Sequence, residues 1–141
     1  MRSVLCPLLL AVVVFGCRKP ADDRETKTKQ PAPVAPTTVD VTVEDLAAAT
    51  MAGSTDDDAV RWLRRRYGSS RLRVTARVAR IGRNKMNRPR LTLVGQGNPN
   101  VAIGANYDGP TSVNDPILLT CGTVSVSDVT VLLGSCERDA L

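Results

Sequence analysis

The sequence predicts a small, mainly β domain: a five-stranded barrel preceded by one or two short helices. The chain has 141 residues, which is enough for one domain once terminal segments are set aside. Apolar and polar residues alternate over much of its second half, as in strands with one buried face. Five such segments follow one another with short breaks rich in Gly, Pro, Asn and Asp. This spacing favours a small antiparallel barrel.

Residues 1–16 have the layout of a lipoprotein signal peptide. Arg2 gives a basic start, residues 4–15 are apolar, and a small residue precedes Cys17. The apolar run is too short to cross a bilayer as a helix and fits a secretory signal. The end of the segment is similar to a lipobox, so we expect cleavage before Cys17 and lipidation of its thiol. Phe15 departs from the residue type usual there. A plain signal peptide or an uncleaved anchor are the alternatives, and both imply export.

Residues 17–38 are predicted to form a disordered tether, and residues 39–141 an OB-fold-like domain. The tether is charged and then rich in proline, with Val34 as its single large apolar residue, so it cannot bury enough surface to fold. Arg18 follows the cysteine, and it carries no signal for retention in an inner membrane. We therefore expect an envelope protein whose first partner is a membrane, held by lipid at the outer membrane and facing the periplasm or the cell surface.

Two of the four cysteines remain for the folded domain. Cys6 leaves with the signal peptide and Cys17 takes the lipid, which leaves Cys121 and Cys136. An even pair in an oxidising compartment favours a disulfide. Closing a loop of about 15 residues would stabilise the fold by roughly 3 kcal/mol. Two buried free thiols are the alternative.

Two helices are predicted before the strands. Thr42 and Asp45 have the spacing of a capping box, and the alanine-rich residues 46–51 continue that helix. Asp56, Asp57 and Asp58 begin a second helix, where the helix dipole favours acidic groups. Arg64, Arg65 and Arg66 lie in its last turn, where positive charge is stabilising, so helix termination alone explains these three arginines. The strands are expected at residues 72–78, 91–93, 101–107, 117–126 and 129–133.

The charges are strongly separated along the chain. Residues 61–90 hold twelve Arg or Lys and no acidic residue. Residues 39–60 and 91–141 together hold eleven acidic residues and one basic residue, Arg138. After residues 1–16 are removed, 18 basic and 14 acidic side chains remain, a net charge of +4. The distribution, more than the sum, points to the segment from residue 71 to residue 94.

That segment also carries a resemblance to a known family. Residues 72–78 (LRVTARV), the Ile81-Gly82 pair, and residues 87–93 (NRPRLTL) are similar to the tRNA_anti-like family, bacterial OB-fold domains found in many exported proteins. The spacing of Cys121 and Cys136 adds to the likeness. The resemblance covers about residues 40–138 and implies a five-stranded OB-fold-like barrel. It does not imply tRNA binding in exported members, and none of the matching motifs is catalytic.

Enzymatic activity is not favoured. The chain contains no His, which removes the commonest general base and the commonest metal ligand. It also lacks the G-x-S-x-G, P-loop and C-x-x-C motifs. The acidic run at residues 56–58 fits a helix N-terminus better than a cation site, because adjacent helical positions point in different directions. We expect a noncatalytic protein that has neither metal nor cofactor.

The candidate binding surface is the basic hairpin. OB-folds commonly bind ligands on the outer face of strands two and three and at two loops, between strands one and two and between strands four and five. The first of these loops is residues 82–89 here. Outward arginines on strand one, the basic loop and Arg90 would form a cationic patch that attracts polyanions in a salt-dependent way. Anionic lipid headgroups, lipopolysaccharide, acidic cell-wall polymers and extracellular DNA are the candidate ligands. The candidate patch comprises Arg71, Arg73, Arg77, Arg83, Lys85, Arg88 and Arg90.

Three alternatives compete with a polyanion site. The arginines could keep an exposed strand soluble or pair with the acidic residues elsewhere in the fold. They could also contact a protein partner. Specific nucleic-acid recognition is the least favoured, because the hairpin has no aromatic residue to stack on bases, a contact worth roughly 1–3 kcal/mol per base. The sequence thus predicts a noncatalytic envelope lipoprotein with an OB-fold interaction module, or alternatively a polyanion-binding protein.

Overall fold

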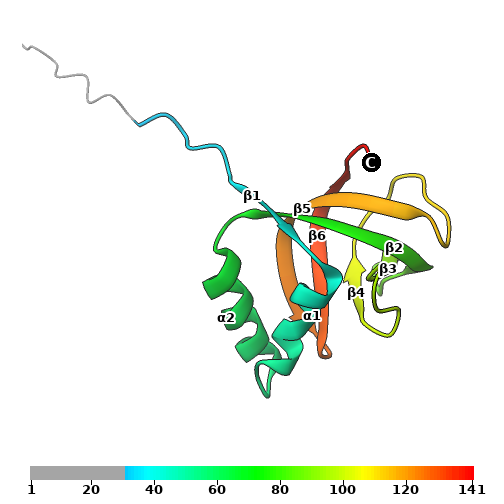
Figure 1. The fold of residues 1–141 in the computed structure, drawn as a ribbon, viewed down its shortest axis with the longest axis horizontal. Coiled ribbons are helices and arrows are strands. Elements are labelled where there is room, and N and C mark those ends of the chain that lie inside the picture. The colour runs from blue at the N-terminus through cyan, green and yellow to red at the C-terminus, as the bar shows by residue number, and fades with distance from the viewer. Residues whose placement is uncertain (1–30) are drawn as a thin grey trace, which may run out of the picture. The chain divides into compact units, whose positions relative to one another are not determined.

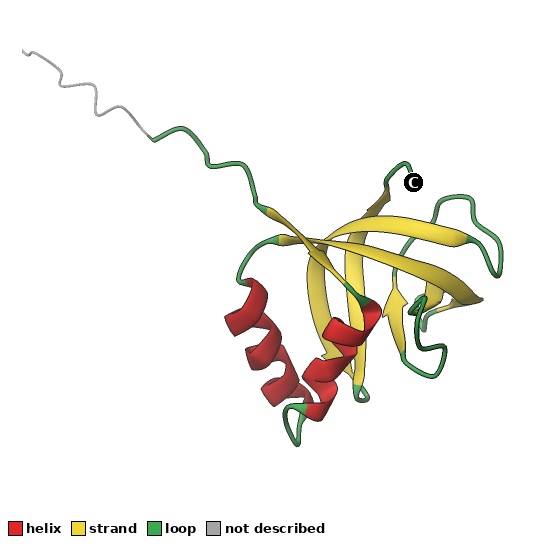
Figure 2. Cartoon of the chain, viewed as in Figure 1, coloured by secondary structure: helices red, strands yellow, loops and turns green. Residues whose placement is uncertain are grey.

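A closed β-barrel with two helices at one end makes up the fold (Figures 1 and 2). The computed structural model describes residues 31–141. The predicted signal peptide, Cys17 and residues 17–30 of the predicted tether lie outside these residues. Residues 31–37 are exposed and lie outside the helices and strands. The elements are β1 (Thr38–Val41), α1 (Val43–Met51), α2 (Asp56–Tyr67), β2 (Arg71–Arg83), β3 (Pro89–Val94), β4 (Ala102–Ala105), β5 (Pro116–Ser127) and β6 (Thr130–Arg138).

Five strands close the barrel in the order β2-β3-β4-β6-β5, and β5 pairs back to β2. The predicted five-stranded, OB-fold-like barrel with two short helices is therefore confirmed. The expectation that it is antiparallel throughout is wrong, because β4 and β6 run parallel. The closure explains this pair. Since β3 and β5 are both antiparallel to β2, β4 and β6 both run in the direction of β2.

A sixth strand, β1, was not predicted. It pairs in parallel with the first four residues of β2, from Thr38 opposite Arg71 to Val41 opposite Val74. β3 pairs with β2 only from Arg77 onward, so β1 covers the length of that edge which β3 does not reach. Four residues are too few to show a clear alternation in the sequence, so the sequence does not predict this strand.

The core follows the predicted alternation. Leu72, Val74, Ala76 and Val78 of β2 are buried, and the residues between them are exposed or partly exposed. α1 contacts β4 and β6, and α2 packs beside α1 and against β5 (Figure 2). The largest fully buried side chains come from both helices and all five barrel strands: Val43, Leu46, Leu63, Val74, Val78, Leu91, Leu93, Ile103, Ile117, Leu119, Val131 and Leu133.

Both predicted helix starts are capped. The Thr42 hydroxyl accepts a hydrogen bond from the backbone N–H of Asp45, and the Asp45 carboxylate accepts from the N–H of Thr42, which completes the capping box. Thr55 accepts in the same way from the N–H of Asp58 at the start of α2. α2 ends at Gly68, whose φ of 59° favours a residue without a Cβ. No helix among residues 31–141 is long and apolar enough to span a bilayer.

The start of α2 also holds the turn between β5 and β6. Asp128 and Val129, the two residues of this turn, have φ of 51° and 58°. Such a left-handed pair matches the twist of a hairpin but is strained for a β-branched residue such as Val129. The carboxylate of Asp56 accepts hydrogen bonds from both backbone N–H groups, at 3.1 and 3.0 Å. One helix residue thereby fixes a strained turn more than seventy positions away.

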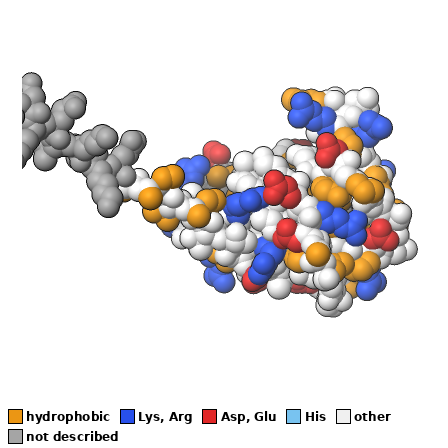
Figure 3. Space-filling view, turned by 90° about the horizontal axis from the view of Figure 1, so that it is seen from above, with side chains coloured by type: hydrophobic (Ala, Val, Ile, Leu, Met, Phe, Trp, Pro, Cys, Tyr) orange, Lys and Arg blue, Asp and Glu red, His pale blue; other side chains and the backbone are white. Residues whose placement is uncertain are grey.

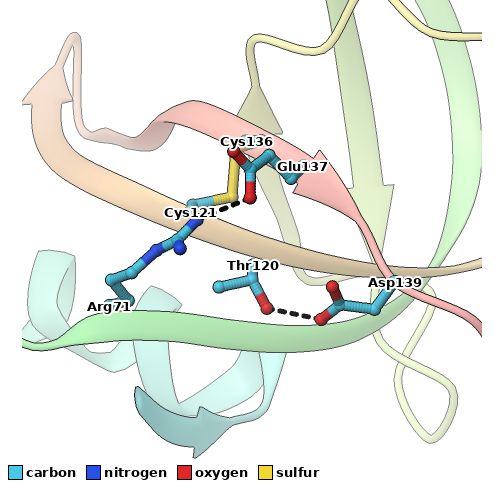
Figure 4. The surroundings of a disulfide bond; sticks show 6 residues. All are labelled: Arg71, Thr120, Cys121, Cys136, Glu137 and Asp139. Carbon is cyan, nitrogen blue, oxygen red and sulfur yellow. Dashed lines mark hydrogen bonds and ion pairs between the residues drawn. A yellow bond between two sulfur atoms is a disulfide. The ribbon is translucent and has the colours of Figure 1, made fainter. Parts of the chain in front are cut away.

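The predicted cysteine pair is present at disulfide distance. The Sγ atoms of Cys121 on β5 and Cys136 on β6 are 2.11 Å apart, and the two residues face each other across the strands (Figure 4). Cys121 is buried, whereas Cys136 is partly exposed. Next to the disulfide, the Thr120 hydroxyl hydrogen-bonds the carboxylate of Asp139 (Figure 4). These contacts join the end of β6 to the middle of β5.

Candidate functional site: the basic β2–β3 hairpin

The seven predicted basic residues fall into two groups. The residues of the first group form ion pairs with carboxylates of neighbouring strands. Arg71 donates a hydrogen bond to Glu137 at 3.0 Å (Figure 4). Arg73 donates two to the carboxylate of Asp40 on β1, the second at 2.9 Å. These hydrogen bonds hold the pKa of Asp40 below its ordinary value of 3.8 and raise the pKa of Arg73. Figure 3 looks onto the side of the barrel with β1, where basic and acidic side chains lie next to one another.

The second group lies in the other half of the hairpin and has no acidic partner. It consists of Arg77 on β2, Arg83 at its end, Lys85 and Arg88 in the loop, and Arg90 on β3. Among residues 31–141, no carboxylate oxygen lies within 4.0 Å of any of these five side chains. The structure therefore does not bring all seven residues together: Arg90 is opposite Gly82, at the far end of β2 from Arg71 and Arg73.

Arg80 belongs to this second group, although the sequence did not identify it. Plain alternation after Val78 would place Arg80 on the buried face. The pairing instead shifts between Val78, opposite Leu93, and Arg80, opposite Thr92, so Ala79 is an extra residue in a β-bulge. The bulge turns Arg80 to the outer face beside Thr92. An arginine in the apolar phase of a strand was the signal for it, since burying an unpaired charge is too costly.

Three arginines surround one depression on the outer face of β2 and β3. The depression has a volume of about 230 Å³ and is lined by Arg80, Gly82, Arg83, Arg90 and Thr92. Gly82 adds no side chain to the depression, and a Cβ added there would have only the Arg90 carbonyl oxygen within 4.0 Å. Guanidinium groups bind carboxylates, phosphates and sulfates with paired, charge-assisted hydrogen bonds. We name this feature the arginine depression.

Arg90 lies against its neighbour on β4. Gly104 is buried, and a Cβ at this position would clash with Cδ2 of Leu132 and lie 3.1 Å from both Nε and Nη2 of Arg90. The guanidinium group therefore lies close to the backbone of β4, beside the Leu132 side chain. Arg90 is accordingly half-buried rather than fully exposed.

The loop between β2 and β3 is ordered by its own hydrogen bonds. Oδ1 of Asn84 accepts from the backbone N–H groups of Met86 and Arg88, and Asn84 N–H donates to the Arg88 carbonyl. Arg83 closes the loop by donating to the carbonyl of Asn87 at 2.8 Å. Asn87 has a φ of 61°, which Asn tolerates better than most residues. Lys85 and Arg88 are thus presented from a defined turn.

Most acidic residues of the described chain are engaged elsewhere. Besides Asp40 and Glu137, the capping, turn and strand-end contacts occupy Asp45, Asp56, Asp58, Asp115 and Asp139. Self-pairing within the fold therefore accounts for Arg71 and Arg73 but not for the second group. Within residues 31–141, no cluster of three or more His, Cys, Asp or Glu side chains could hold a metal ion.

The basic end of α2 is a separate surface. Arg66 lies over the ring of Trp62, 5.3 Å from its centroid, and Arg61 pairs with Asp58. Arg64 and Arg65 are exposed in the last turn of the helix. These arginines fit the predicted role in helix termination.

Comparison with known proteins adds no family to this description: no family model, curated protein or solved structure matches the chain.

Proposed function

We propose that this chain is an exported, noncatalytic lipoprotein whose OB-fold-like barrel binds polyanions. In this proposal, lipid on Cys17 holds it at a membrane of the cell envelope. The observation that supports this function is the arginine depression. Three guanidinium groups, of Arg80, Arg83 and Arg90, meet on the outer face of β2 and β3 without a carboxylate of the described chain beside them. Lys85 and Arg88 extend the same charge into the loop.

The arrangement favours a polymer over a single small anion. The depression is shallow and its cations continue along the hairpin, so a chain of regularly spaced charges gains from several contacts at once. Its lining contains no aromatic residue, which argues against a single-stranded nucleic acid. Anionic lipid headgroups, lipopolysaccharide and acidic cell-wall polymers are the ligands of the envelope that carry such charges.

The proposal is tested by measuring the affinity of the full-length chain for lipopolysaccharide and for an acidic polysaccharide over a series of salt concentrations. The double variant Arg80→Ser/Arg90→Ser should bind on the order of tenfold or more weakly and with a smaller salt dependence, because two charge-assisted contacts are lost. The matched control is Arg64→Ser/Arg65→Ser, which removes the same charge from α2 and should bind like the wild type.

Equal weakening of both double variants would show that net charge, and not the arginine depression, governs binding. Undiminished binding by the hairpin variant would exclude the site altogether.

The lipid anchor is examined separately by labelling cells with radioactive palmitate. Incorporation should be lost in Cys17→Ala, and label that persists in this variant would rule out lipidation at Cys17.

A further inference from the structure

A second hollow lies near the arginine depression, at the start of β3. It has a volume of about 420 Å³. Pro89 lines it, whereas the next residue, Arg90, lines the arginine depression. Because consecutive strand residues point to opposite faces, the two hollows lie on opposite sides of this strand. The lining includes Arg88, Pro89, Asn106, Tyr107, Asp108 and Ser135.

The hollow forms where β4 and β6 separate. The two strands pair only at Gly104 with Leu132 and at Ala105 with Leu133. One further hydrogen bond, from Asn106 N–H to the Leu133 carbonyl at 2.9 Å, ends their contact. β6 then passes through Ser135, whose φ of 52° is unusual for a residue other than glycine. Backbone outliers of this kind concentrate at ligand sites.

The lining has the chemistry of a sugar site. The Arg88 side chain can donate hydrogen bonds and the Asp108 carboxylate can accept them. The side chains of Asn106 and Ser135 can both donate and accept. Among residues 31–141, none of these four side chains makes a hydrogen bond or ion pair with another residue. The partly buried ring of Tyr107 and the ring of Pro89 add flat apolar surface. Sugar rings present hydroxyl groups at their edges and C–H groups on their faces, which match these two kinds of surface.

We propose that this hollow binds a sugar ring of an acidic polysaccharide whose charged groups contact the arginine depression. The inference rests on the proposed function and narrows its ligand to a carbohydrate. The ordered loop links the two hollows, because Arg83 lines one and Arg88 lines the other, and Asn84 hydrogen-bonds the backbone between them. The carboxylate of Asp108 repels anionic groups, which disfavours a phosphate chain, whereas a sugar ring can place its hydroxyl groups beside Asp108 and its own carboxylate beside Arg88. The polar lining disfavours an acyl chain.

Three probes separate sugar from charge. The full-length chain is titrated with a galacturonate hexasaccharide, with a linear polyphosphate of six phosphates and with an uncharged glucose hexasaccharide. We expect the galacturonate to bind about tenfold or more tightly than the polyphosphate, since stacking and hydroxyl contacts add to the ionic ones. The uncharged hexasaccharide should bind most weakly, because it lacks the contacts with Arg80, Arg83 and Arg90.

Two variants locate the sugar. Tyr107→Ala and the double variant Asn106→Ala/Asp108→Ala should each weaken galacturonate binding several-fold. Neither should weaken polyphosphate binding, and loss of the Asp108 carboxylate can only favour it. Asn106 and Asp108 are exposed and make no side-chain hydrogen bond with the described residues, so their replacement leaves the fold intact even if Tyr107→Ala disturbs packing. Tyr107→Phe is the matched control and should keep most of the affinity, because the ring remains.

The inference is overturned if polyphosphate binds as tightly as galacturonate, or if the Asn106→Ala/Asp108→Ala chain loses affinity equally for both. Either result leaves the proposed polyanion site standing. A different result would contradict the proposed polyanion site itself: the Arg80→Ser/Arg90→Ser variant would bind both charged probes as tightly as the wild type.

Discussion

The two halves of β2 carry the same residue type and use it differently. In the first half, Arg71 and Arg73 each face a carboxylate, from β6 and from β1. In the second half, Arg77, Arg80 and Arg83 face none among the described residues. The difference lies in the neighbouring strands rather than in β2 itself. β1 and β6 bring acidic residues to its start, whereas β3 and the loop bring only further cations to its end.

A run of basic residues in a sequence therefore does not define a binding site by itself. Alternation identifies which arginines point outward, but only the pairing of strands decides which of them are neutralised. The first half of β2 is held by cross-strand ion pairs and by the nearby disulfide. The second half keeps its charges available for a ligand.

The largest effect should come from the disulfide beside the paired half. Replacing both Cys121 and Cys136 by Ala should lower the free energy of unfolding by roughly 3 kcal/mol, measured by urea denaturation, because the unfolded chain gains conformational entropy. Affinity for an acidic polysaccharide under native conditions should not change. A loss of affinity in the double variant would show that the two halves of β2 are not independent. A melting temperature of the wild type that does not change under reductant would argue against the disulfide.

A carboxylate placed in the unpaired half should convert it into a paired one. Thr92 lies opposite Arg80 and lines the arginine depression with Arg90. Thr92→Glu should therefore reduce affinity for the acidic polysaccharide by about tenfold, because the new charge competes with the ligand. Thr92→Gln is the control of equal size and should bind like the wild type. If Gln weakens binding as much as Glu, space rather than charge limits the site.

The smallest effect should follow from freeing an arginine in the paired half. Asp40→Asn removes the partner of Arg73, and polyanion affinity should rise by no more than about threefold, because an exposed cation is screened by salt. The pKa of Asp40 is lowered in the folded state, so its pairing stabilises the fold above pH 3.8 and is lost as the pH falls below that value.

The same variant checks this pH dependence. The difference in urea midpoint between wild type and Asp40→Asn should be present at neutral pH, decrease as the pH falls below 3.8, and disappear once the pH is below the lowered pKa of Asp40. A difference that persists in acid would mean that Asp40 acts through packing and not through its charge.

Much of the fold followed from local signals in the sequence. The capping box of Thr42 and Asp45, the acidic start of α2 and the alternation of β2 each act over a few positions, so local rules identify them. β1 and the parallel pairing of β4 with β6 depend on which segments meet after the barrel closes. No rule that reads neighbouring residues contains that information.

The candidate site was predicted in part for the same reason. Arg83, Lys85, Arg88 and Arg90 were identified because the hairpin itself is local. Arg80 was missed because its outward position depends on the bulge at Ala79. The separation of Arg71 and Arg73 from the rest depends on carboxylates that lie 66 and 33 positions away, respectively. The hollow beside Tyr107 arises where two strands part, which sequence periodicity does not record.

The contact between Asp56 and the turn at Asp128 and Val129 has a consequence for the order of folding. Thr55 can cap α2 as soon as the helix forms, because their hydrogen bond spans three positions. The Asp56 contact must close a loop of more than seventy residues, and such closure is slow and entropically costly. A nascent chain can therefore form α2 early, but this contact can form only after the turn between β5 and β6 has been made.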